Sequence, residues 1–86
     1  MYDIFGKELK NYDIVIFPFM ITGNFNKKYV ELRYGIIKGK RIYTFGLDNK
    51  IVYKLLSPAE KMIYKVDGEI PAEIMTKIMG IKEFLS

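Results

Sequence analysis

Six cationic side chains fall between positions 27 and 41 of this chain, and Glu31 is the only acidic residue among them. The basic residues are Lys27, Lys28, Arg33, Lys38, Lys40 and Arg41, and they are interleaved with Tyr29, Tyr34 and Tyr43. Lysine and arginine neutralise phosphates, and tyrosine rings stack on unpaired bases. The segment therefore predicts a nucleic-acid-binding surface made of the six basic residues and Tyr43.

Two other interpretations fit the same residues. The positive surface could contact an acidic protein, such as a host protein. Alternatively, the lysines could only keep the exposed face of a hairpin soluble and its edge unpaired, while the tyrosines fill the core. Salt dependence separates these interpretations, because binding to nucleic acid weakens steeply as salt rises.

Catalysis is not expected. The 86 residues contain no cysteine and no histidine, which removes thiolate zinc sites, cysteine nucleophiles and Ser-His-Asp chemistry. The carboxylates are scattered and form no recognisable hydrolase or metal pattern. We therefore expect a protein that is not an enzyme, with no catalytic residues, no metal and no cofactor.

The net charge of +4 is unevenly distributed. Residues 1–66 hold 12 basic and 6 acidic groups, a net +6, whereas residues 67–86 hold 2 basic and 4 acidic groups, a net −2. The first five residues lack the basic start of a signal peptide, and the apolar run 14–21 is too short to cross a bilayer. These features predict a cytoplasmic protein without a membrane partner.

Hydrophobic patterning predicts five short strands. A strand that is apolar apart from Asp13 covers 12–19, and Pro18 is expected to mark a bulge or the strand end. After a loop at 22–26, residues 29–37 and 41–45 alternate and form a β-hairpin around a turn at 38–40. Gly35 suggests a bulge or sharp bend within this hairpin.

The rest of the chain changes from strands to a helix. Residues 46–49 are a turn, 51–56 a strand, 57–60 a single helical turn and 62–66 a short last strand. Residues 71–85 have helical periodicity, with an apolar stripe made of Ile74, Ile78, Ile81 and Leu85. Met75 and Met79 lie beside this stripe, so they are either part of the core or a partner-binding strip.

These elements predict a mainly β fold, a small five-stranded barrel with a C-terminal α-helix. The opening Gly6-Lys7-Glu8-Leu9-Lys10, the later Leu32-Arg33-Tyr34-Gly35-Ile36-Ile37 and the closing stretch 58–66 resemble the small SH3-like barrel proteins encoded by bacteriophages, and more distantly KOW-type barrels. The resemblance covers about residues 6–66. It implies an SH3-like barrel at 1–66, a phage origin and a location in the host cytoplasm. The amphipathic helix of 67–86, which the resemblance does not explain, is expected to pack on the barrel within one domain.

The resulting functional expectation is a binding module that contacts nucleic acid or a nucleoprotein complex through the 27–41 hairpin. KOW-like barrels often bind such partners, so the resemblance supports this expectation. The alternative is a protein-interaction module that modulates a host protein through the C-terminal helix, at Met75 and Met79, or through an exposed barrel edge. A third hypothesis is a small structural subunit that works only as an oligomer.

Overall fold

The computed structural model describes residues 2–46, 48–56 and 62–86, which fold into one antiparallel sheet and one helix. The strands are β1 (Ile14–Thr22), β2 (Lys28–Lys38), β3 (Arg41–Phe45), β4 (Ile51–Leu55) and β5 (Tyr64–Lys65), a 3₁₀ turn η1 (Asn24–Asn26) joins β1 to β2, and the helix is α1 (Ala72–Leu85). The mainly β class, the five strands and the C-terminal helix agree with the sequence-based prediction. The helical turn expected at 57–60 lies outside the described residues.

The sheet is open. Its strand order is β4-β3-β2-β1-β5, so the last strand lies beside the first, but no pairing between β4 and β5 is present in the described part of the chain. Closure into a barrel, which the sequence predicts, is therefore not seen. The antiparallel arrangement itself follows from the short turns between consecutive strands.

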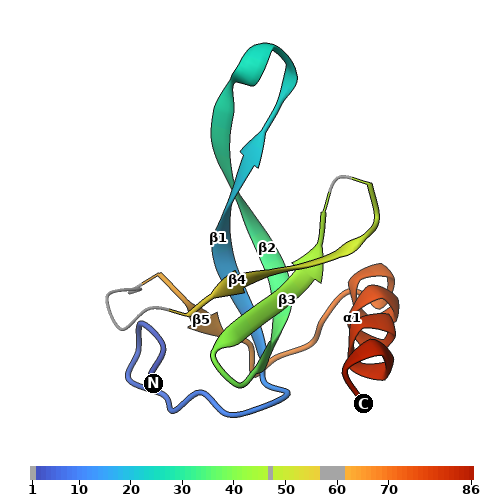
Figure 1. Ribbon diagram of the computed structural model, residues 1–86. Coiled ribbons are helices and arrows are strands. Elements are labelled where there is room, and N and C mark those ends of the chain that lie inside the picture. Colours follow the sequence, from blue (N-terminus) through green and yellow to red (C-terminus); the bar gives the residue numbers. More distant parts are fainter. Residues whose placement is uncertain (1, 47, 57–61) are drawn as a thin grey trace.

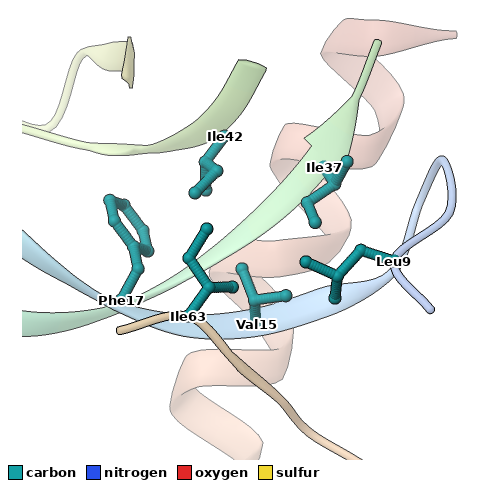
Figure 2. Packing of buried hydrophobic residues seen from close by; sticks show 6 residues of the cluster. All are labelled: Leu9, Val15, Phe17, Ile37, Ile42 and Ile63. Atoms are coloured by element: carbon teal, nitrogen blue, oxygen red, sulfur yellow. The ribbon is translucent and has the colours of Figure 1, made fainter. Parts of the chain in front are cut away.

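Each face of the sheet carries its own hydrophobic cluster, because side chains alternate between the faces along each strand. One face holds the cluster drawn in Figure 2, made of Leu9, Val15, Phe17, Ile37, Ile42 and Ile63. The other face is covered by α1, whose Ile78 and Ile81 pack against Ile36 of β2. The helix lies behind the sheet in Figure 2, on the side opposite the labelled side chains. The predicted apolar stripe of the helix is thus confirmed as core.

The N-terminal segment is held against β5 by the buried carboxyl of Asp3. Its Oδ1 accepts hydrogen bonds from the backbone N–H groups of Phe5 and Lys7, at 2.9 and 2.8 Å, and its Oδ2 accepts one from Lys65, at 3.0 Å. Burial acts to raise the pKa of Asp3, but the three backbone donors outweigh it and hold the pKa below its usual 3.8.

Pro18 is neither a bulge nor a strand end, contrary to the sequence-based expectation. The β1–β2 pairing runs without interruption from Ile14 opposite Ile36 to Thr22 opposite Lys28, and Pro18 stands opposite Leu32 within it. The physical reason lies in the direction of the backbone groups. Ile14 directs its carbonyl away from β2, to Val66, so every second residue, including Pro18, also faces outward. The missing N–H therefore removes no bond to β2.

Gly35 is not a bulge, because it pairs in register with Val15. It lies instead where the backbone of β2 passes close to β3. A Cβ at this position would lie 2.7 Å from the Tyr43 carbonyl oxygen and 2.8 Å from side-chain atoms of Ile42 and Phe17. The β2–β3 ladder ends one residue away, at Ile36 opposite Tyr43. Beyond it, side chains bridge the two strands: Thr44 Oγ1 donates to the Tyr34 carbonyl at 2.7 Å.

The long strands project from the body as a two-stranded ribbon (Figure 1). Beyond the end of the β3 pairing, residues 28–34 of β2 pair with β1 alone among the described strands. We call residues 18–32 the arm: the outer parts of β1 and β2 with the loop that joins them. The loop is closed by a hydrogen bond from the Gly23 N–H to the Lys27 carbonyl at 2.7 Å.

Candidate nucleic-acid interface

The basic residues of positions 27–41 do not form one surface. Lys27 and Lys28 lie at the tip of the arm, whereas Lys38, Lys40 and Arg41 lie at the turn that joins β2 to β3. The ten steps from Lys28 to Lys38 span about 33 Å at the usual rise of a strand. A single hairpin surface, as the sequence suggested, is therefore replaced by two separate basic regions.

Arg33 belongs to neither region, because its guanidinium bridges the gap between β2 and β3. Its Nη1 donates to the Phe45 carbonyl at 2.8 Å, and its Nη2 forms an ion pair with Glu31 at 3.2 Å. Its Nε is buried and has no hydrogen-bond partner among the described residues. Arg33 thus joins the strands where their ladder ends, and its predicted role as a phosphate contact is not favoured by this position.

Lys38 connects the β2–β3 turn to the end of the helix. Its Nζ donates to the Leu85 carbonyl at 2.5 Å and to the Tyr12 hydroxyl at 3.1 Å. A cation is favourable there because the last carbonyls of a helix are unpaired and carry partial negative charge. The Lys82 ammonium lies 6.0 Å from the centre of the same Tyr12 ring.

Arg41 stacks on an aromatic pair beside Lys38. Its guanidinium carbon lies 4.4 Å from the centre of the exposed Tyr53 ring, and its Nη1 donates to the Tyr43 hydroxyl at 3.5 Å. The Tyr43 and Tyr53 ring centres are 5.8 Å apart, since the two residues are paired across β3 and β4. The hydrogen bond to Tyr43, with the nearby tyrosine side chains, raises the pKa of Arg41. An arginine is charged at physiological pH in any case.

These groups lie on the same face of the sheet. Lys38 and Arg41 are paired across β2 and β3, and side chains of paired residues point to the same side. We call the set the cation–tyrosine cluster; its members are Lys38, Arg41, Lys82, Tyr12, Tyr43 and Tyr53. Such a cluster can offer cations to phosphate and ring faces to bases.

Three members of the cluster were not identified from the sequence. Tyr53 has a readable signal: the strands at 41–45 and 51–56 are joined by a short turn, and their register brings Tyr53 opposite Tyr43. Tyr12 and Lys82 come from opposite ends of the chain, and their proximity depends on where the helix docks. No local pattern in the sequence contains that information.

The predicted partner-binding methionines lie on the outer side of the helix. Met75 and Met79 are exposed, the latter by 50%, while Ile78 and Ile81 face the sheet. Phe84 is exposed on the same helix. The methionines are thus available to a partner and are not part of either buried cluster in the described residues.

Comparisons with known protein families, with curated proteins and with solved structures find no match. Within the described ranges, no three acidic side chains come together in a group that could hold a metal ion. The one helix described there is too short and too polar to span a membrane. The geometry of the cation–tyrosine cluster is therefore the basis for the functional proposal that follows.

Proposed function

We propose that this protein is a non-enzymatic binding module that contacts single-stranded nucleic acid, alone or within a nucleoprotein complex, through the cation–tyrosine cluster. The observation that carries the proposal is the exposed stack of Arg41 on Tyr53, beside Tyr43. An exposed aromatic ring offers a stacking surface to any base, and each stacked base contributes about 1–3 kcal/mol of binding free energy.

The cations supply the phosphate contacts in this proposal. Tyr43 accepts from one of the five N–H donors of Arg41, and a phosphate can accept from the others. Lys82 and Lys40, which lies exposed in the adjacent turn, add two more cations. If Arg41, Lys82 and Lys40 each contact one phosphate, the logarithm of the binding constant should fall with the logarithm of the salt concentration with a slope of about −2 for a single strand.

The proposal includes the relation to SH3-like barrels and the phage origin suggested by the sequence resemblance. The pairing of β5 with β1 supports it, because a barrel of five strands needs this pair as well as the three consecutive hairpins. One further pair, β4 with β5, would complete such a barrel.

Fluorescence anisotropy with labelled single-stranded DNA and RNA at low salt tests the proposal. We expect binding that falls with salt, and a loss of affinity of about tenfold or more in Arg41→Gln or Tyr53→Leu, equivalent to about 1.4 kcal/mol. Lys28→Gln is the matched control, since it removes the same charge as Arg41→Gln at the tip of the arm.

Two results would refute the proposal. One is the absence of binding to either polymer at low salt. The other is an equal loss in Lys28→Gln and Arg41→Gln, which would mean that overall charge, and not the cluster, determines binding.

A further inference from the structure

The outer part of β2 has an unused backbone edge. The Ile37 N–H and carbonyl bond to the segment before β1, so alternate residues of β2 direct their backbone groups to the other side. In the arm these are Lys28, Val30 and Leu32, and β3 no longer pairs with β2 at this level. An exposed strand edge of this kind is a template for pairing with another strand.

The opposite edge of the arm is blunted. Pro18 has no N–H to offer on the outer side of β1, and its carbonyl accepts a hydrogen bond from Lys54 Nζ at 3.3 Å. The two edges of the arm therefore differ: the β1 edge lacks the outward N–H at Pro18, whereas Lys28, Val30 and Leu32 all keep theirs on the β2 edge.

The side chains along the β2 edge are apolar on one face. Leu32 and Val30 are 67% and 61% exposed, and their cross-strand partners on β1 are Pro18 and the 62% exposed Met20. No charged side chain lies on this face between Tyr34 and Lys28. The surface is unsuited to phosphate, and it is suited to an apolar protein surface.

We propose that two copies of this chain pair through their β2 edges, antiparallel, around a two-fold axis at Val30. In this register Val30 faces the partner's Val30, and Lys28 faces the partner's Leu32, so the outward backbone groups of both strands meet. Tyr29 faces the partner's Glu31, whose carboxylate can accept from the tyrosine hydroxyl. No like charges oppose each other between residues 28 and 32. One like-charged pair, Lys27 with the partner's Arg33, lies beyond this segment, and Arg33 is already paired with Glu31.

A cleft in the body points to the same partner. Where β2 leaves β3, a cleft of about 360 Å³ opens between the sheet and the helix. Leu32, Phe45 and Ile74 give it apolar surface, and Glu31, Arg33 and Lys77 add charged groups. At the tip of the arm, Phe25 is 94% exposed and held there by a left-handed backbone conformation, φ 61°. In the register centred on Val30, the partner's Lys28 stands opposite Leu32, which lines the cleft. Pairing stops there, because the Tyr34 carbonyl already accepts from Thr44 Oγ1. The proposal places the partner's Phe25, in the turn just beyond its Lys28, at the mouth of the cleft, so each copy supplies both an aromatic tip and a cleft that receives one.

Sedimentation velocity over a range of about 1 µM to 1 mM tests the pairing. We expect a concentration-dependent monomer–dimer equilibrium in the unmodified chain and a monomer at every concentration in Val30→Pro. The substitution removes an outward N–H and leaves the β1–β2 ladder intact, as Pro18 already does on the other strand. Met20→Pro is the matched control: it removes an outward N–H from the β1 edge, and the dimer should persist.

Two further variants make the test independent of backbone changes. Leu32→Lys places a cation opposite the partner's Lys28 and should abolish the dimer without altering the backbone. Phe25→Ser should raise the dissociation constant about tenfold or more. Far-UV circular dichroism checks that each variant folds.

The pairing proposal is overturned by a monomer throughout the range, by a dimer that Leu32→Lys and Val30→Pro leave unchanged, or by equal loss in Val30→Pro and Met20→Pro. A monomer would leave the β2 edge to a different protein as its partner. Because no group of the cation–tyrosine cluster lies in the arm, failure of nucleic-acid binding would leave the dimer intact, and the two proposals fail separately.

Discussion

Gly35 allows β2 to pass close to β3 before the two strands separate, and replacing it with alanine tests this packing. The new Cβ would meet the Tyr43 carbonyl oxygen at 2.7 Å and the side chains of Ile42 and Phe17 at 2.8 Å. Overpacking a core costs about 1–3 kcal/mol. We expect a value near the upper end, because one of the three neighbours is backbone of the adjacent strand and another, Ile42, is fully buried. A loss of about 2–3 kcal/mol corresponds to a fall in melting temperature of roughly 8–24 °C for a domain of this size.

Urea unfolding followed by circular dichroism measures this loss, with Gly68→Ala as the matched control. No atom lies within 4 Å of a Cβ built on Gly68, and its φ is not in the left-handed region. The control should be neutral or more stable by up to about 1 kcal/mol, since alanine restricts the unfolded chain. Equal unfolding free energies for the two variants would refute the close approach at Gly35.

The helix and the N-terminal segment give two further predictions. Ile81→Ala should lower the free energy of unfolding by about 2–5 kcal/mol, because Ile81 is buried against the sheet. Met79→Ala, on the outer side of the helix, should change it by less than about 0.5 kcal/mol. Urea unfolding measures both, and similar losses would contradict the assignment of the two helix faces. Asp3→Asn should be less stable than the unmodified chain near neutral pH. Because folding lowers the pKa of Asp3, its carboxylate contributes fully to stability above pH 3.8, the usual pKa, and this contribution is lost as the pH falls through the folded-state pKa. The unfolding free energies of the two proteins should therefore converge in acid. A difference that stays constant with pH would contradict this.

Most of the secondary structure could be predicted because it follows from local patterns. Alternation defined β2 and β3, the two-residue turn between them followed from Gly39 and its neighbours, and the 3.6-residue period defined α1 almost to the residue. The continuous apolar run predicted β1, although the strand continues past Pro18 to Thr22. Proline is incompatible with a strand only where its N–H would bond, and the sequence does not show which side of the strand that is.

The candidate site was predicted less well, because the basic residues were treated as one surface. An extended strand places Lys28 and Lys38 at opposite ends, about 33 Å apart, and the turn keeps Arg41 beside Lys38 whatever the length of β3. The predicted Arg41 and Tyr43 remain together and gain Tyr53. Arg33 instead binds the Phe45 carbonyl in the gap between the strands. The contacts of Arg33 depend on tertiary structure, which composition and spacing do not encode.

The unequal lengths of the strands also explain why the β2 edge is uncovered in the arm, among the described residues. β2 has 11 residues and β3 has 5, so the first residues of β2 extend past its neighbour on one side. Charged side chains at a strand edge discourage pairing with other chains. Of the three outward positions of β2 in the arm, Lys28 is charged, whereas Val30 and Leu32 are exposed apolar residues. On the β1 edge, Pro18 lacks an N–H and its carbonyl accepts from Lys54. The apolar pair Val30 and Leu32 beside outward backbone groups is what favours association in our proposal. The two-fold register at Val30 would satisfy those groups and place Lys28 opposite the partner's Leu32, with no like-charged pair between residues 28 and 32.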